Sequence, residues 1–154
     1  MQPGIRAGSD GHVTNSMPAG KVFLDANILV YAEDQDSPAK RRRSREVIAA
    51  LAESGTGVIS TQVLQEFYVT VTRKLGVAPL AAKSVLQTFK IFEIVQASPD
   101  LIESAIDCSV LNAISFWDAL IVAAAASSGC VIVYSEDLNP GQTIQGVRIE
   151  NPLG

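Results

Sequence analysis

Four acidic side chains lie directly after predicted strands or in the first turns of predicted helices. They are Asp25, Glu66, Asp118 and Asp137. Two carboxylates about 5 Å apart repel each other by roughly 3 kcal/mol at an effective dielectric of 20. Four of them on one rim would therefore require a cation between them. Oxygen ligands without His or Cys favour Mg²⁺ or Mn²⁺, and such ions suit phosphoryl chemistry because they keep several waters.

Each acid also has an ordinary structural interpretation. Asp is a favoured N-cap residue, so Asp25 would cap a helix that follows it. Ser115 and Asp118 fit a capping box. Glu66 lies away from the apolar stripe of its helix and would be a solvated surface residue, and Asp137 belongs to a turn-forming segment. The sequence leaves these interpretations open.

Composition narrows the chemistry further. The chain has 154 residues, is 47% hydrophobic, and carries 16 acids against 12 Lys and Arg for a net charge of −4. This describes one folded domain and excludes a disordered tail protein or a globally basic nucleic-acid coat. The single histidine, His12, lies in a polar leader, which argues against a Ser-His-Asp triad or a histidine zinc site. No glycine-rich nucleotide-binding motif occurs.

Cysteine usage and hydropathy predict a cytoplasmic location. Cys108 and Cys130 are too few for a disulfide scaffold and are expected to be buried thiols in a reducing compartment. The longest apolar run, residues 119–126, falls far short of the ~20 residues that a membrane span needs. We expect no membrane partner.

Apolar runs and helical stripes alternate after residue 20. Residues 1–20 are rich in Gly, Pro, Ser and Asn and are expected to be a leader, with residues 21–154 forming one domain. The patterns predict strands at 21–25, 57–60, 91–95, 130–134 and 147–149, and helices at 38–54, 61–75, 79–90, 98–111 and 115–128. This alternation predicts an α/β fold with a parallel sheet covered on both faces. Because such sheets place their sites beyond the carboxyl ends of the strands, the four acids are expected to converge.

Four segments resemble the PIN domain family, specifically the VapC-type toxin ribonucleases. They are FLDANILVY at 23–31, STQVLQEFY at 60–68, SFWDALIVAA at 115–124 and YSEDL at 134–138. Their order and spacing resemble the family over about residues 21–150, and the Trp-Asp-Ala stretch is the most telling. The leader departs from the family, whose members usually begin close to the first strand.

The resemblance implies roles for individual residues. Asp25, Glu66 and Asp118 match the three central acids, and Asp137 matches a fourth. The supporting positions are matched by Asn27 and Ser135, while Glu136 is an alternative to its neighbour Asp137.

The resemblance also implies an overall fold and activity. The fold would be a three-layer α/β/α sandwich, and the activity metal-dependent endonucleolytic cleavage of RNA with Mg²⁺ or Mn²⁺. The partners would be an antitoxin protein that blocks the site and a second copy in a homodimer.

An acidic protein that cleaves RNA must still bind a polyanion. Five of the twelve basic residues lie within six positions, at Lys40, Arg41, Arg42, Arg43 and Arg45. They would contact phosphates without reading sequence, or form only a solvated helix face. Bases would stack on Tyr31, Tyr68 or Trp117, and Arg73 and Lys74 would only complement the dipole at the end of their helix. Trp117 is expected to pack in the core instead. An antitoxin groove would use Val47, Leu51, Val71 or Leu75, although we expect these to be core residues.

Two other classes remain. A receiver-like domain would bind Mg²⁺ and accept a phosphoryl group on Asp25, but it normally needs a lysine beyond a late strand, and residues 134–146 contain none. A non-catalytic interaction domain would keep the fold without the catalytic residues. The presence of all four acids argues against this class.

Overall fold

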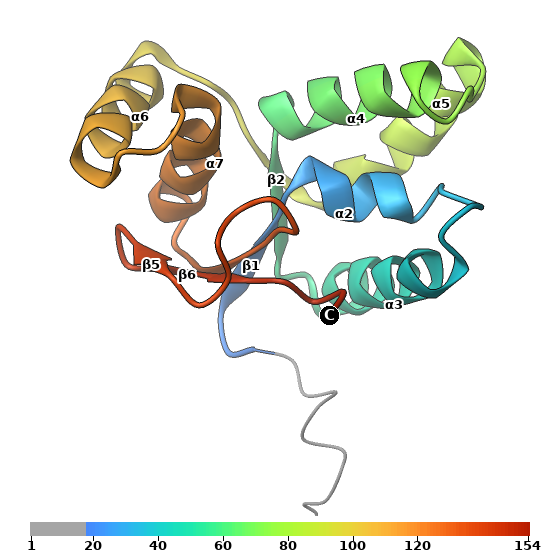
Figure 1. Cartoon of the computed structure of the whole chain (residues 1–154), viewed down its shortest axis with the longest axis horizontal. Helices are drawn as coiled ribbons and strands as arrows, with labels where there is room; N and C mark the ends of the chain where they lie inside the picture. The colour runs from blue at the N-terminus through green and yellow to red at the C-terminus, as the bar shows by residue number, and fades with distance from the viewer. Residues whose placement is uncertain (1–17) are drawn as a thin grey trace, which may run out of the picture.

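The structure is a computed structural model that describes residues 18–154 (Figure 1). Most of the expected leader, including His12, lies outside the described residues. The strands are β1 Lys21–Leu24, β2 Gly57–Ser60, β3 Glu93–Val95, β4 Cys130–Tyr134, β5 Thr143–Ile144 and β6 Val147–Glu150. The helices are α2 Ala26–Tyr31, α3 Pro38–Ser54, α4 Thr61–Arg73, α5 Pro79–Thr88, the 3₁₀ turn η2 Phe89–Ile91, α6 Pro99–Asn112 and α7 Phe116–Ser127.

The six strands form one sheet in the order β3-β2-β1-β4-β6-β5. All neighbouring strands are parallel except β5 and β6, which are antiparallel. This confirms the predicted α/β fold with a mostly parallel central sheet and flanking helices. From β1 the chain proceeds to β2 and β3 on one side, then returns to β4 on the other. The strand order therefore reverses between β1 and β4, which is where ligands bind in open α/β sheets.

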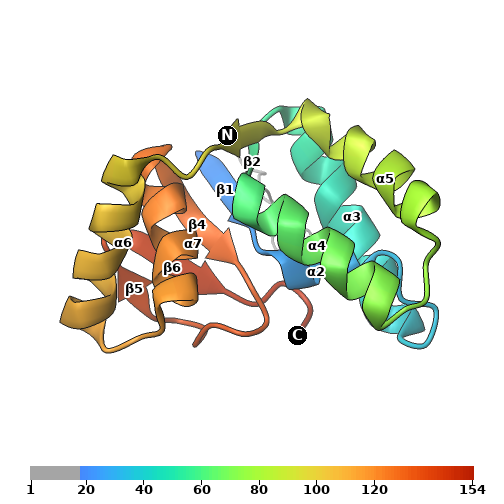
Figure 2. The same cartoon turned by 90° about the horizontal axis from the view of Figure 1, so that it is seen from above.

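The helices cover the sheet in two groups (Figure 2). α7 packs across β4 and also touches β2 and β6, while α6 packs against α7 from outside. α3 and α4 pack against β2, and α2 lies between them. The small residues of α7 let it approach the sheet closely, and every residue from Ala119 to Ala125 is buried.

The apolar character of α7 reflects burial in this core. In the described part of the chain, no single helix is long and apolar enough to cross a membrane. The pair α6 and α7 meets that criterion together, but it bends by 116° between the two helices. Cys108 and Cys130 are free and buried, as predicted, and burial raises the pKa of both thiols.

The structure corrects several predicted boundaries. α2 was not assigned a range, and the short strand β5 was not predicted. The strand expected at 91–95 begins only at Glu93, because Phe89 to Ile91 form the 3₁₀ turn. Residues three apart share one side of a 3₁₀ turn, so Phe89 and Phe92 both enter the core, where Phe89 packs edge-on against Phe67 at 5.0 Å.

Gly57, at the start of β2, provides a test of this packing. A Cβ atom there would lie 2.5 Å from the ring of Phe92 and 3.2 Å from Leu51. We therefore expect Gly57→Ala to destabilise the protein by about 1–3 kcal/mol through overpacking, as measured by urea denaturation. Adding Phe92→Leu should recover part of that loss. An unchanged unfolding midpoint in the single variant would contradict the packing described.

Candidate active site at the carboxyl ends of β1 and β4

Asp25 lies immediately after β1 and is 7% exposed. Its Oδ1 accepts a hydrogen bond from the backbone N–H of Ala26 at 2.8 Å, which caps α2. Its Oδ2 accepts one from the Ser135 hydroxyl, also at 2.8 Å. The capping interpretation is therefore correct for Asp25, and the same carboxylate also faces a pocket.

Ser135 and Asn27 surround the Asp25 carboxylate. Ser135 is fully buried, and its Oγ accepts the N–H groups of Asp137 and Leu138 at 3.1 and 3.3 Å. These contacts direct the hydroxyl proton toward Asp25. Asn27 Nδ2 lies 3.5 Å from Asp25 Oδ2, and its Oδ1 accepts the N–H of Glu136 at 3.1 Å. The backbone after β4 is thus attached to the end of β1.

This environment changes the protonation of Asp25. Burial raises the pKa of its carboxyl to about 6, although the hydrogen bonds from Ser135 and Ala26 oppose that rise. The negative charges of Glu66 and Asp137 contribute to this rise. The folded protein thus holds a desolvated carboxylate with two other acids near enough to act on it electrostatically.

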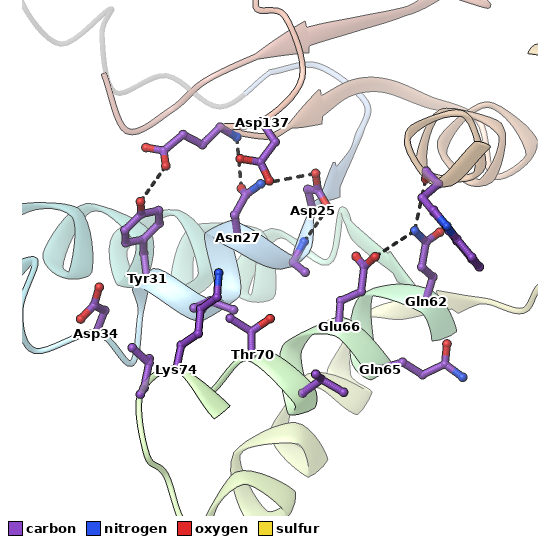
Figure 3. A pocket seen from close by; sticks show the side chains of 16 residues that line it. Asp25, Asn27, Tyr31, Asp34, Gln62, Gln65, Glu66, Thr70, Lys74 and Asp137 are labelled. Carbon is purple, nitrogen blue, oxygen red and sulfur yellow. Dashed lines mark hydrogen bonds between the residues drawn. The ribbon is translucent and has the colours of Figure 1, made fainter. Parts of the chain in front are cut away.

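Asp25, Glu66 and Asp137 all line one pocket of about 730 Å³ (Figure 3). Glu66 projects from α4 toward Asp25, and its Oε2 accepts a hydrogen bond from Gln62 at 3.2 Å. Glu66 is half-buried, so it is not the solvated surface residue that the alternative interpretation predicted. Asp137 is exposed in the loop that follows β4.

Asp118 lies beside this pocket without lining it. It is half-buried in the first turn of α7, where its N–H donates to the Ser115 hydroxyl at 3.1 Å, which is one half of the predicted capping box. Its neighbour Trp117 does line the pocket. Three of the four predicted acids therefore line one pocket, and Asp118 is not part of that lining.

The donor set of this pocket fits a hard divalent cation. Asp25, Glu66 and Asp137 supply only carboxylate oxygens, the ligands that Mg²⁺ and Mn²⁺ prefer. A cation would also offset the repulsion that raises the pKa of Asp25. The three carboxylates are nevertheless not gathered around one point, since no group of three Asp, Glu, His or Cys side chains within residues 18–154 is placed to hold an ion.

Glu136 differs from its neighbour Asp137 because it is paired. Lys40 Nζ lies 2.6 Å from Glu136 Oε2, and the Tyr31 hydroxyl donates to Glu136 Oε1 at 2.7 Å. Burial by itself would raise the pKa of Glu136, but these two hydrogen bonds outweigh it and lower the pKa. Asp137 forms no ion pair with any described residue, so its carboxylate is the freer of the two.

The arginines of the basic cluster on α3 do not line this pocket. Arg43 Nε donates to the backbone carbonyl of Pro152 at 3.0 Å, and Arg45 Nε donates to that of Ala32 at 2.8 Å. Both arginines therefore hold chain segments together. A second hollow of about 520 Å³ on α3 is lined partly by Arg41, Arg42 and Arg45.

Three residues that line the pocket differ from what the sequence predicts. Trp117 was expected in the core, which is wrong, because its side chain is 61% exposed and only its neighbour Phe116 turns inward. Gln62 has no role in the sequence analysis, and Lys74 is expected there only to complement a helix dipole, yet both line the pocket. They lie four residues before and eight residues after Glu66, so helical spacing would have found them.

Comparison with solved structures supports this fold. A toxin–antitoxin complex from Klebsiella pneumoniae has a chain that matches with a TM-score of 0.64 at 19% identity, covering 86% of this chain and 98% of that one. A DNA-bound VapBC complex from Salmonella typhimurium matches with a TM-score of 0.64 at 21% identity and the same coverage. VapC20 from Mycobacterium tuberculosis, described as a toxin that cleaves the sarcin–ricin loop, gives 0.57 at 21% identity, covering 76% and 90%.

Comparison of the sequence gives the family. A search of curated proteins found no match. The family model described as the PIN domain matches residues 22–142, which include β1, β4 and the pocket between them. The chain therefore belongs to the PIN domain family, and its structural neighbours are VapC toxins of VapBC toxin–antitoxin systems.

Proposed function

We propose that this protein is a metal-dependent endoribonuclease and the toxin of a type II toxin–antitoxin system. The observation that supports this most directly is the buried Asp25 carboxylate, which faces a pocket shared with Glu66 and Asp137 on a PIN fold. Such a group is costly to the folded protein, and perturbed carboxyls of this kind occur preferentially at functional sites.

The reaction would be hydrolysis of an RNA phosphodiester. Asp25, Asp137 and, from the edge, Asp118 would hold a divalent ion, with Ser135 and Asn27 orienting the Asp25 carboxylate. When bound, Mg²⁺ or Mn²⁺ supplies a water of lowered pKa and offsets the charge on the phosphate oxygens. Glu66, oriented by Gln62, would position the attacking water. The water oxygen would bond to phosphorus and lose a proton, while the bond from phosphorus to the leaving ribose oxygen breaks and that oxygen takes up a proton.

The alternative classes fit this geometry less well. A receiver-like phosphoacceptor normally needs a lysine beyond a late strand, and residues 134–146, from the end of β4 onward, contain none. A non-catalytic interaction domain would gain nothing from a desolvated acid whose pKa is raised to about 6. An apolar or amide side chain at position 25 would make such a domain more stable.

An antitoxin would act by occupying the same pocket. Two of the similar structures are toxin–antitoxin or VapBC complexes. Beside the acids, the pocket has an apolar wall formed by Val30, Val69 and Leu75, which would accept apolar side chains of such a partner. The other candidates for an antitoxin groove, Val47, Leu51 and Val71, are buried in the core as expected.

We propose that two copies of the chain pair through α6. α6 exposes the apolar side chains of Ile102, Ile106 and Val110 at a spacing of four residues, so they form one stripe along the helix. A second copy would cover this stripe. Sedimentation velocity should then give a mass of two chains, whereas a monomer at all concentrations would contradict the proposal. An activity on cellular RNA and an antitoxin partner would place the protein in the cytoplasm.

The first prediction concerns the carboxylate itself. Asp25→Asn keeps the shape and the cap of α2 but removes the charge that would hold the metal. We expect cleavage of RNA in the presence of Mg²⁺ to fall by more than about 100-fold, because even indirect contacts to a metal cost 10–100-fold. Asp118→Asn should likewise remove nearly all cleavage.

Asp107→Asn provides the matched control, since Asp107 is an exposed acid on α6 away from the pocket. Asp107→Asn should cleave RNA at the wild-type rate, and EDTA should stop cleavage by the wild type and by this variant. Cleavage at the normal rate by Asp25→Asn would contradict the proposed function. Normal cleavage by Asp118→Asn would remove that residue alone from the site.

The second prediction concerns stability without metal. The pKa of Asp25 is raised from 3.8 to about 6 in the folded protein. The contribution of the protonated Asp25 carboxyl to the free energy of unfolding is therefore fully present below pH 4 and is lost as the pH rises through 6. In EDTA, the free energy of unfolding of the wild type should fall relative to Asp25→Asn by up to about 3 kcal/mol between pH 4 and pH 7. Urea denaturation at several pH values measures this difference.

Added Mg²⁺ should restore stability to the wild type at neutral pH and leave Asp25→Asn unchanged. Asp107→Asn should follow the wild type at every pH. Parallel pH profiles for the wild type and Asp25→Asn would show that the Asp25 carboxyl is not desolvated in solution.

A further inference from the structure

The pocket is chemically different at its two ends. Asp25, Glu66 and Asp137 lie in its middle, Gln62 lies to one side of them, and Lys74 lies toward the end formed by Asp34 and Tyr31 (Figure 3). Trp117 also lines the pocket, and its backbone carbonyl accepts a hydrogen bond from Gln62. An aromatic surface, a group of acids and an ammonium group therefore follow one another along a single pocket.

The indole of Trp117 is exposed although its backbone is fixed. The Trp117 carbonyl accepts a hydrogen bond from Gln62 Nε2 at 3.2 Å, which ties the first turn of α7 to α4. The ring contacts Phe116 edge-on at 5.1 Å, so its 61% exposure leaves a large flat face toward solvent. Exposed aromatic rings beside a nucleic-acid path stack on unpaired bases.

Lys74 supplies a positive charge at the opposite end. It caps the C-terminus of α4, eight residues after Glu66, which corresponds to about 12 Å along the helix. Its ammonium group forms no ion pair with any described residue, unlike that of Lys40, which is bound by Glu136. Asp34 also lines this end, and its Oδ1 accepts the N–H of Asp36.

We propose that this pocket is a track for one unpaired RNA strand, which passes the acids between two fixed contacts. One base stacks on the indole of Trp117, and a backbone phosphate beyond the cleaved bond binds Nζ of Lys74. The inference rests on the proposed function and adds to it two positioning residues, Trp117 and Lys74. Duplex RNA would not fit, because its bases are already stacked on one another.

Tryptophan fluorescence tests the first contact directly, because Trp117 is the only tryptophan in the sequence. The experiment uses the full chain carrying Asp25→Asn, so that binding is measured without cleavage. A short mixed-sequence single-stranded oligoribonucleotide should quench the emission saturably, and the same sequence in a duplex should not.

Anisotropy of the labelled oligoribonucleotide then measures affinity in the same background. Adding Trp117→Ala should weaken binding roughly 5- to 150-fold, as expected for the loss of one stacked base, and Trp117→Phe should recover part of that loss. Leu80→Ala is the control, since Leu80 is a large exposed apolar residue on α5 outside the pocket, and it should bind normally.

The salt dependence of binding tests the second contact. Loss of one phosphate contact should reduce the slope of log K against log salt by about 0.7 for a single strand, so Lys74→Ala should show this reduction. Arg73→Ala removes the same charge from the neighbouring exposed position outside the pocket and should leave the slope unchanged.

The outcomes separate the inference from the proposed function. If the wild type cleaves RNA but the emission does not respond and both variants bind normally, the track is wrong and the nuclease proposal stands. An emission that changes with protein concentration and not with RNA would assign Trp117 to an interface between copies and overturn the inference. If the chain neither binds nor cleaves RNA, both proposals fail.

Discussion

The arrangement of the site depends on one buried carboxylate at the point where the strand order reverses. Asp25 ends the central strand β1, and its backbone N–H donates to the carbonyl of Tyr134 at the end of β4. This bond brings Ser135 against the Asp25 carboxylate. A parallel sheet makes the two strand ends neighbours, although they are 110 residues apart in sequence. The fold therefore assembles a negative site whose repulsion only a cation or a proton relieves.

A second connection joins the two groups of helices around that carboxylate. Gln62 on α4 donates to both Glu66 and the carbonyl of Trp117 at the start of α7. One buried amide therefore orients an acid from one side of the pocket and fixes the aromatic rim on the other. Any shift of α7 relative to α4 would change both at once. The spacing between the acids and the rim is consequently a property of helix packing more than of a flexible loop.

Much of this could be predicted from local sequence patterns. The strands and long helices were found because their apolar spacing is regular, and Asp25, Glu66 and Asp137 were found because they follow strand ends. Trp117 was misplaced because the apolar character of residues 119–125 was extended to the first turn of α7, which projects beyond the sheet. The six residues of α2 are too few to show a helical period. Whether Asp118 lines the pocket depends on how α7 packs, which no local pattern contains.

The basic residues of α3 show why a count of charges alone would mislead about the proposed RNA binding. Lys40 belongs to the basic cluster of α3, yet it neutralises Glu136. Arg43 and Arg45 donate to backbone carbonyls. Much of the local positive charge is thus used to hold the chain together. A protein with a net charge of −4 cannot attract a polyanion through its overall field. The proposed RNA binding would then rely on short-range contacts inside the pocket, where a metal ion would offset the acids and stacking needs no charge.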